Sequence, residues 1–525
     1  MLRGTIGAAV VALLILGRGD AVDTAFDGFW QARTVGEASD RVSDVLRSGV
    51  SFDDAYQRLK KGRSYGPQSS GTVRLTNRTE DRVEHQYAVT IPDNYDPSKK
   101  YQVRVQLHGG VMMRHSNVPP PNAGGIGALA GAEQIYIVPF AWDAEAWWTD
   151  DELLNLHAIL DRAKRDYNID ENRVVLSGVS DGGTGTYYVA MRDTTPFASF
   201  LPLNGFMMVL GAGDLVVDGP LYPNNMKNKP FFIVNGLRDP LYPVKTVEPY
   251  IEHYKAGGVA VDYHPQDAAH NTSWWPQVKD IYEAFVRDHP RSPYPDTLTW
   301  ETADTAAHPS TSLSAGNRAH WLVIDALGHP KDEASSLPDL NDYTGPPAPD
   351  FGVRASGHRI MRVMPGSNAE KLGLKAGDVL MHLNDEPIPL TQDISEALEH
   401  VKPGTTIQIM VARDNAPVDV DGVYDPQIVT LPAKQLFDRS RPWGRVDLKR
   451  SGNTVTAATR GVTKFTLLIS PDQFDFNKPI TVVANGKTVF NARVQKDRGV
   501  LMKWAAVDND RTMLFGAELH IELRD

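Results

Sequence analysis

A serine flanked by glycines is the first group in this sequence that could do chemistry. Ser180 lies in Gly178-Val179-Ser180-Asp181-Gly182, directly after the apolar run 174–176. This pattern is typical of a nucleophile elbow, a sharp strand-to-helix turn that exposes the serine hydroxyl above a sheet. Glycines are needed because a Cβ at either place would collide with the neighbouring strand and helix. The pattern predicts that Ser180 is a nucleophile.

A serine hydroxyl is a weak nucleophile until a base takes its proton. In chains with such an elbow, an acid and then a histidine follow the serine. Asp239 comes just after the buried-looking strand 231–234, and His270 lies in a loop before the helical stretch 278–288. We expect His270 to act as the general base, and Asp239 to fix its tautomer and stabilise the imidazolium.

Other interpretations of these residues stay open. Asp262 and Asp267 are rival acids, and Asp267 is expected in the same loop as His270. Asp239 is also a plausible turn former before Pro240, and His270 could be a loop residue that caps the next helix. The joint order along the chain and the placement at strand ends favour the triad.

The loop after the expected strand 103–107 predicts an oxyanion hole. It reads His108-Gly109-Gly110, a turn whose backbone N–H groups face a developing negative charge. We expect the N–H of Asp181 and an N–H near Gly110 to bind the oxyanion. This arrangement is the one that acyl transfer requires.

A cluster of tryptophans follows the expected strand 135–139 and precedes the expected helix 151–167. Loops at the carboxyl ends of parallel strands face the site in such sheets. The candidate residues for lining a substrate cleft are His108, Gly109, Trp142, Trp147 and Trp148. The alternative is that the tryptophans pack under the helix, since aromatic side chains dominate core burial.

With these residues in place, residues 84–290 resemble the esterase and depolymerase branch of the α/β-hydrolases. That branch includes feruloyl esterases and polyhydroxybutyrate depolymerases, and it grades into prolyl-oligopeptidase-like peptidases. The matching stretches are 91–96, 107–110, 167–174, 197–205 and 269–271. The resemblance implies an α/β fold with a mostly parallel sheet, a triad of Ser180, Asp239 and His270, and no metal or organic cofactor. The acid lies in Leu-Arg-Asp-Pro-Leu-Tyr-Pro, where many relatives carry Val-Pro just after it, a difference on the substrate side.

Length and composition bound the remaining possibilities. The chain has 525 residues, which predicts two to four domains. Its net charge of −11, with no basic cluster and no Gly-rich phosphate loop, argues against nucleic acid as a partner. The sequence contains no cysteine, which excludes disulfides and thiolate metal sites.

The N-terminus is typical of an exported protein. Arg3 precedes the apolar run 6–16, which has the length of a signal-peptide core and is too short to span a bilayer comfortably. We therefore expect a signal peptide or anchor over residues 1–21 and a periplasmic or extracellular location. A mis-assigned start is the alternative. No later segment is apolar for long enough to predict a transmembrane domain.

Helical periodicity follows the expected signal segment. Aromatic and aliphatic residues recur mostly at spacings of three and four between residues 24 and 62. We expect an N-terminal helical segment over residues 22–65, docked on an α/β-hydrolase catalytic domain over residues 66–291.

Residues 338–434 change character. A Pro-rich opening at 346–349 leads to Ser367-x-Ala369-x-x-x-Gly373-Leu374-x-x-Gly377-Asp378. This run resembles a PDZ domain, most like those of bacterial high-temperature-requirement proteases. The resemblance implies that Phe351 and Gly352 form the loop whose N–H groups catch a peptide's terminal carboxylate, while the peptide adds a strand to the domain's edge. The alternative is an unused groove in a domain that serves as a spacer or lid.

The last part of the chain is rich in strand signals. Residues 437–525 fit a small β-sandwich, with Asn485-Gly486 as a hairpin turn. Residues 297–328 also look like strands, and a lone hairpin would be marginally stable. We predict that they pair with 437–525, so that the PDZ domain is inserted into a discontinuous β-rich domain.

Together these features predict an exported serine hydrolase that cleaves a carboxylic ester through an acyl-enzyme on Ser180. A peptide bond is the main alternative, because a PDZ domain captures peptides. Two alternatives are not enzymes: a catalytically silent scaffold, and a protein whose β-rich domain binds a polymer. The presence of all three triad residues argues against the scaffold.

Overall fold

A computed structural model describes most of the chain. The described residues are 20–78, 84–111, 126–141, 146–213, 215–303, 316–328, 338–389, 394–430, 432–439 and 441–523. Residues 1–19 of the expected signal segment and Trp142 lie outside the described residues. The chain forms two compact units: one holds the residues up to Asn341 together with Gln435–Asp525, and the other is Asp342–Lys434. None of the described helices has the length and apolar character needed to cross a membrane.

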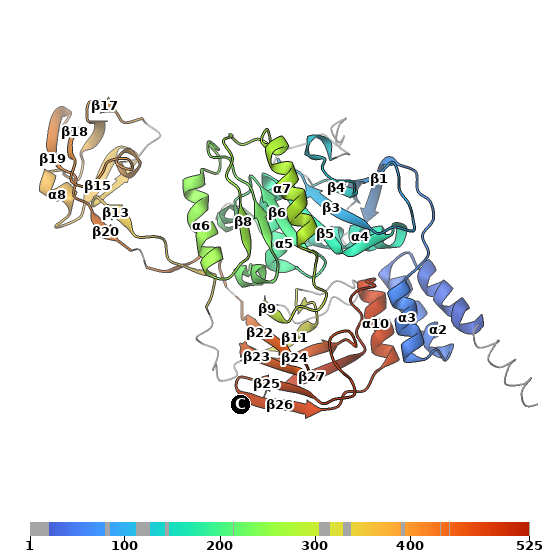
Figure 1. Cartoon of the computed structure of the whole chain (residues 1–525). Helices are drawn as coiled ribbons and strands as arrows, with labels where there is room; N and C mark the ends of the chain where they lie inside the picture. The colour runs from blue at the N-terminus through green and yellow to red at the C-terminus, as the bar shows by residue number, and fades with distance from the viewer. Residues whose placement is uncertain are drawn as a thin grey trace, which may run out of the picture. The chain divides into compact units, whose positions relative to one another are not determined.

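The larger unit contains an eight-stranded sheet in the order β1-β2-β4-β3-β5-β6-β7-β8 (Figure 1). Its strands are β1 (Gly71–Arg78), β2 (Glu84–Ile91), β3 (Tyr101–Leu107), β4 (Ile135–Pro139), β5 (Ile169–Val179), β6 (Ser199–Leu203), β7 (Phe231–Ile233) and β8 (Val261–Tyr263). Pairing is antiparallel from β1 to β4 and parallel between all later neighbours. Since β4 and β6 are buried along their whole length, both faces of the sheet are covered. The predicted α/β-hydrolase fold is confirmed.

Helices connect these strands. The main ones are α4 (Asp150–Asp166), α5 (Asp181–Arg192), α6 (Val244–Ala256) and α7 (Trp275–Asp288), and the 3-10 turns are η1 (Gly127–Leu129), η2 (Met207–Gly211) and η3 (Pro223–Asn228). The Thr149 hydroxyl caps α4 by accepting the N–H of Glu152, in a first turn rich in acidic residues. In contrast, Ser180 occupies the capping position of α5, but its side chain makes no capping hydrogen bond and contacts His270 instead. The serine is thus kept free of a helix-capping role.

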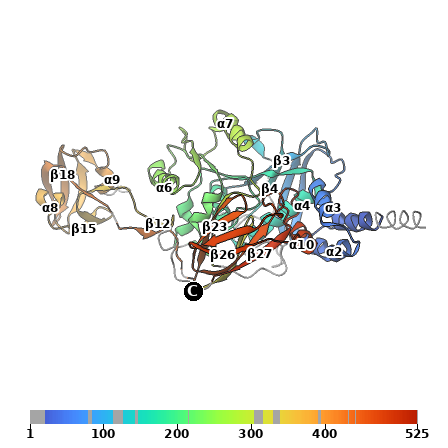
Figure 2. The same cartoon turned by 60° about the horizontal axis from the view of Figure 1, so that its bottom comes forward.

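The N-terminal helices pack on a partner that the sequence did not indicate. Residues 20–31 are helical, followed by α2 (Val35–Arg47) and α3 (Phe52–Lys61). Their apolar faces share one core with α10 (Arg498–Asp508), which lies beside them in Figure 1 and Figure 2. The sequence predicted docking on the hydrolase region, and a contact of that kind is also present, because Arg165 of α4 donates to the carbonyl of Ala32 at 3.0 Å. Periodicity shows which face of a helix is buried but not what covers it.

The β-rich region consists of two sheets around a single apolar core. Its strands are β9 (Thr297–Thr302), β10 (Arg318–Ala319), β11 (Leu322–Leu327), β22 (Gly444–Ser451), β23 (Thr454–Arg460), β24 (Val462–Ile469), β25 (Ile480–Ala484), β26 (Lys487–Ala492) and β27 (Ala517–Glu522). β9 pairs antiparallel with β22, and β11 pairs antiparallel with β24. Residues 297–328 therefore share both sheets with the end of the chain. In the sequence, the smaller unit lies between these two segments.

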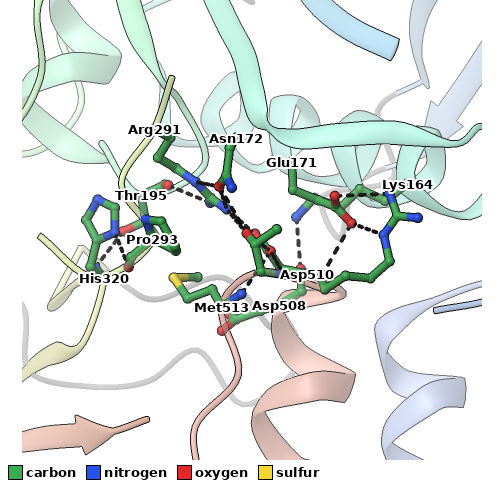
Figure 3. A network of polar contacts seen from close by, with 12 residues as sticks. Lys164, Glu171, Asn172, Thr195, Arg291, Pro293, His320, Asp508, Asp510 and Met513 are labelled. Carbon is green, nitrogen blue, oxygen red and sulfur yellow. Dashed lines mark hydrogen bonds and ion pairs between the residues drawn. The ribbon is translucent and has the colours of Figure 1, made fainter. Parts of the chain in front are cut away.

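Charged side chains are buried where the β-rich region meets the eight-stranded sheet (Figure 3). Arg291 donates to Asp510 at 2.6 Å, and both side chains are buried. Arg318 binds Asp508 at 2.6 Å, beside a cavity of about 90 Å³. Removing one partner of a buried ion pair costs about 3–5 kcal/mol, because the other charge is left unpaired. These contacts join the two regions into one unit.

Polar contacts also hold the two segments that lead into and out of the smaller unit. The Asn341 side chain accepts the N–H of Phe437 and donates to its carbonyl, both at 2.9 Å. Arg439 binds the carboxylates of Asp339 and Glu301. Burial raises the pKa of Glu301 to about 7, although Arg439 opposes the shift. Two carboxylates thus share one guanidinium at the base of the insertion.

The smaller unit contains a sheet with the strand order β14-β15-β16-β18-β19 and has a core of its own. Its elements are β12 (Asp342–Tyr343), β13 (Ala348–Asp350), β14 (Val353–Ser356), β15 (Arg359–Val363), α8 (Asn368–Leu372), β16 (Val379–Leu383), β17 (Glu386–Pro387), α9 (Ile394–Ala397), β18 (Thr406–Arg413), β19 (Ala416–Val423), β20 (Gln427–Val429) and β21 (Lys434–Gln435), whose last residue belongs to the larger unit. The predicted PDZ motif, residues 367–378, has a physical basis. Ser367 caps α8, and Gly373 ends this helix at φ 93°. The Asp378 carboxylate accepts hydrogen bonds from the N–H of Lys375 and the guanidinium of Arg413.

Candidate active site

Ser180 occupies the turn between β5 and α5 in a conformation that few residues adopt. Its φ is 57° and its ψ is −120°, outside the helical and strand regions. Its N–H donates to the carbonyl of Leu203 at 2.9 Å, and its carbonyl accepts the N–H of Thr184. Such strain is typical of residues that a surrounding structure holds in place for function.

The two glycines of the elbow are required by close backbone approaches. A Cβ on Gly178 would lie 2.0 Å from the carbonyl oxygen of Gly182. A Cβ on Gly182 would lie 2.3 Å from the carbonyl oxygen of Leu107, at the end of β3. Because backbone atoms cannot move aside, only glycine fits at both positions. The turn is therefore as tight as the motif predicted.

A hydrogen-bonded chain of three side chains runs from Ser180. His270 Nε2 lies 2.8 Å from Ser180 Oγ, and His270 Nδ1 lies 2.6 Å from Asp239 Oδ2. The other oxygen of Asp239 accepts the N–H groups of Leu241 and Tyr242, at 2.9 and 3.0 Å. With the carboxylate fixed on both oxygens, the imidazole is held with one nitrogen facing the hydroxyl.

The rival acids lie elsewhere. Asp267 is 78% exposed at its side chain and pairs with Arg238 at 2.9 Å. Asp262 contacts His264 at 2.9 Å. Neither carboxylate contacts His270, so Asp239 is the acid that the geometry couples to the histidine.

Sequence reasoning missed the contacts that bring the acid and histidine loops together. A Cβ on Gly236 would lie 2.5 Å from the carbonyl oxygen of Ala268, so the two loops touch through backbone. The Asn204 side chain donates to the carbonyl of Asn271, next to the histidine, at 2.8 Å. Asn204 and Gly236 lie in stretches that end strands β6 and β7. Small and polar residues at strand ends were the only available signal.

The loop after β3 passes directly over the serine. A Cβ on Gly109 would lie 2.9 Å from the Cβ of Ser180, and Gly110 has a φ of 75°. Asp181 is the first residue of α5, so its N–H has no partner within the helix. Gly109 and Asp181 thus lie next to the nucleophile, where an oxyanion hole requires N–H donors.

Two side chains brace that loop. The Asp181 carboxylate accepts the N–H of Val111 at 2.9 Å, which ties the loop to the start of α5. His108 donates from Nδ1 to the carbonyl of Gly109 and accepts the N–H of Ala141 at Nε2. His108 thus ties the loop after β3 to the backbone at Ala141, just after β4. The sequence predicted a role for the Asp181 N–H but not for its carboxylate.

The tryptophan expectation needs correction. Trp147 and Trp148 are each 1% exposed, so neither indole lines an open cleft. Trp147 packs against α5, where a Cβ on Gly185 would lie 2.4 Å from it, and its Nε1 donates to the carbonyl of His108. Large apolar surfaces are more stable in the core than facing water. The two side chains therefore support the site from within the domain.

Aromatic residues of other loops lie beside the histidine. Tyr242 meets the His270 ring edge to face, with centroids 5.3 Å apart. The centroid of the Phe206 ring lies 6.0 Å from that of Tyr242 and 5.8 Å from that of Tyr250. Burial raises the pKa of Tyr242 to about 12, so the phenol stays neutral near pH 7. Tyr242 belongs to the stretch Leu241-Tyr242-Pro243, in which the acid loop differs from that of many members of the family it resembles.

No group of three or more metal-ligating side chains occurs among the described residues.

In the smaller unit, Phe351 is buried against Tyr424, with ring centroids 5.8 Å apart. Gly352 has a φ of 90°, and its N–H donates to the side chain of Asp350. The expected carboxylate-binding loop is thus already in contact with a carboxylate of its own chain.

Comparison with known proteins finds different relatives for different parts of the chain. The PDZ domain model matches residues 340–421. A bifunctional acetylxylan esterase/xylanase of Neocallimastix patriciarum is 26% identical over 200 residues, which are 38% of this chain and 24% of that protein. The periplasmic pH-dependent serine endoprotease DegQ of Escherichia coli is 30% identical over 78 residues, 15% of this chain and 17% of the other. The chain thus spans less than a quarter of either relative.

Among solved structures, a thermostable esterase matches with a TM-score of 0.34 and 23% identity, over 42% of this chain and 63% of the other. The matches in sequence and the sheet topology agree on the parts of the molecule. The chain combines an α/β-hydrolase fold, similar in sequence to esterases, with a PDZ domain.

Proposed function

We propose that this protein is an exported serine hydrolase that cleaves a carboxylic ester through an acyl-enzyme on Ser180. The observation that carries the proposal is the hydrogen-bonded chain from Ser180 through His270 to Asp239. Nucleophile, base and orienting acid in this order form the constellation that activates a serine.

The proposed reaction has two halves. In the first, His270 Nε2 takes the proton of Ser180 while Oγ attacks the ester carbonyl carbon, and the N–H groups of Asp181 and Gly110 bind the oxyanion. The tetrahedral intermediate collapses, the C–O bond to the alcohol breaks, and His270 gives its proton to the departing oxygen. In the second half, His270 deprotonates a water that attacks the acyl-enzyme, and the acid product leaves with Ser180 restored.

Ester is preferred to amide as the substrate. One relative is named a bifunctional acetylxylan esterase/xylanase, and the esterase half of that name supports an ester bond. The PDZ domain supports the second candidate, a peptidase, because such domains capture polypeptide segments. The similarity to a periplasmic endoprotease supports export, together with the apolar run at residues 6–16.

The proposal is tested by hydrolysis of p-nitrophenyl acetate and butyrate, compared with a prolyl p-nitroanilide. We expect turnover of the esters and loss of about 10⁴-fold or more in the Ser180→Ala variant. Ser273→Ala is the matched control, because Ser273 is exposed and lies just past His270. Faster anilide than ester cleavage would select the peptidase, and ester cleavage that survives Ser180→Ala would refute the proposal.

A further inference from the structure

Asp350, the last residue of β13, lies directly before the loop where a peptide ligand would bind. Asp350 Oδ1 accepts the N–H of Gly352 at 2.8 Å. Arg354 donates to both oxygens of the same carboxylate, at 3.0 and 2.8 Å. Asp350 thus has the contacts that the terminal carboxylate of a bound peptide would need.

The Asp350 carboxylate is partly buried, the Arg354 side chain is 53% exposed, and the backbone of the loop is tied to its neighbours. The guanidinium of Arg354 lowers the pKa of Asp350, so the carboxylate is ionised near pH 7. The carbonyls of Phe351 and Gly352 accept the N–H groups of Ala369 and Met364, at 3.0 and 2.8 Å. A Cβ on Gly352 would lie 2.1 Å from the Cβ of Ser367, so the loop backbone has little room to move.

A free C-terminal carboxylate gains nothing at such a loop. To reach the N–H of Gly352 it must displace Asp350, which breaks as many charge-assisted hydrogen bonds as it forms. The displaced Asp350 then lies beside a second negative charge, and like charges at close range repel. Ligands that end at the loop are therefore disfavoured.

The neighbouring strand still offers a place for a polypeptide. In the described part of the unit, β14 is the first strand of the sheet and pairs on one side only, with β15. An unpaired strand edge is a template for an added strand, whose main-chain hydrogen bonds give affinity without any terminal charge. Residues 354–356 are exposed along this strand.

We propose that the PDZ domain binds an internal, extended segment of a polypeptide at the edge of β14, and that Asp350 excludes chains ending there in a free carboxylate. The occupant is a segment whose chain continues past the loop. This proposal does not depend on the activity of Ser180.

Two pools of fluorescein-labelled decapeptides test it on the full-length protein. The pools share the same randomised sequences and differ only in their last group, a carboxylate or a carboxamide, which mimics a continuing chain. We expect the carboxamide pool to bind more tightly by roughly tenfold, the value of one charge-assisted hydrogen bond. Bound peptide should slow amide hydrogen exchange in residues 353–356.

Substitutions at the acid should reverse the preference. Asp350→Ala frees the N–H of Gly352 and the guanidinium of Arg354, so the carboxylate pool should become the tighter ligand by about tenfold. Asp350→Asn keeps an acceptor oxygen but removes the charge, and should fall between. The control is Asp419→Ala, an exposed acid on β19, at the other end of the sheet.

Three results would overturn the proposal. These are tighter binding of the carboxylate pool by the unaltered protein, an unchanged preference in folded Asp350→Ala, and binding of neither pool. Ester hydrolysis by the same preparations, measured in parallel, distinguishes this failure from a failure of the proposed activity.

Discussion

The elbow at Ser180 and the loop at Gly352 are both tight turns built around glycines, yet they leave their functional groups in opposite states. At the elbow, the hydroxyl contacts the imidazole that would activate it. At the PDZ loop, the N–H that would bind a ligand is already bonded to Asp350. A motif fixes the path of the backbone, but the neighbouring side chains decide whether a group is available.

The difference has a physical reason. Catalysis needs a nucleophile preorganised by partners of its own chain, so internal hydrogen bonds favour it. Binding needs donors that lose only water when the ligand arrives, so an internal hydrogen bond of equal strength opposes it. The same kind of contact thus supports one site and closes the other.

The largest effect is expected from Asp239→Asn. The amide cannot hold His270 in the tautomer that accepts the serine proton, so kcat for p-nitrophenyl ester hydrolysis should fall about 10⁴-fold. Asp267→Asn is the matched control, since that exposed carboxylate pairs with Arg238. Equal losses in both variants would break the assignment of the acid.

Next in size is a pH effect at the base of the PDZ insertion. Burial raises the pKa of Glu301 to about 7, above an unfolded value of about 4.5. The stability from protonated Glu301 is therefore fully present below about pH 4.5 and lost as the pH rises through 7. Relative to the unaltered protein, Glu301→Gln should gain on the order of 3 kcal/mol in free energy of unfolding between pH 4.5 and 8.

Urea unfolding at several pH values measures this gain. Groups that face Glu301 are Arg439, Asp339, Asn224, Arg445 and Lys227, and they remain in both proteins. A difference between the two proteins that stays constant with pH would contradict the assignment to Glu301.

A smaller loss is expected at the oxyanion loop. Asp181→Ala removes the acceptor for the N–H of Val111, which loosens the loop over Ser180 and should lower kcat by about 10- to 100-fold with little change in KM. Asp181→Asn keeps an oxygen acceptor and should restore most of the rate. A loss in the Asn variant as large as in the Ala variant would mean that the charge, not the hydrogen bond, matters.

The smallest effect on catalysis sharpens the contrast between the two glycine turns. Gly352→Ala forces a side chain into φ 90° and places its Cβ 2.1 Å from the Cβ of Ser367, so it should destabilise the PDZ unit by at least about 1–2 kcal/mol while leaving ester hydrolysis unchanged. Differential scanning calorimetry and the ester assay measure the two quantities. A fall in hydrolysis would show that the units are coupled.

Much of the fold could be predicted because it is recorded locally. The apolar strand before Ser180, the glycines around it and the turn after β3 each have a local signal, so the elbow and its loop were expected. The PDZ motif likewise reports a cap, a helix end and a buried acid in one short run. Such features depend on neighbours in the sequence.

What could not be predicted depends on distant partners. The pattern of the N-terminal helices gives no sign of α10, which forms more than 400 residues later. Trp147 lies in a loop but packs inward on Gly185, and the carboxylate of Asp181 reaches across to Val111. Asp350 is close in sequence to Gly352, but its contact depends on a side-chain rotamer rather than on residue type.

The most direct test of the central claim is covalent labelling with a fluorophosphonate, followed by mass-spectrometric mapping of the adduct. We predict one adduct on Ser180 in the unaltered protein and in Asp350→Ala, and none in Ser180→Ala. A folded protein that takes no label, or one labelled at another residue, would contradict the claim that Ser180 is an activated nucleophile.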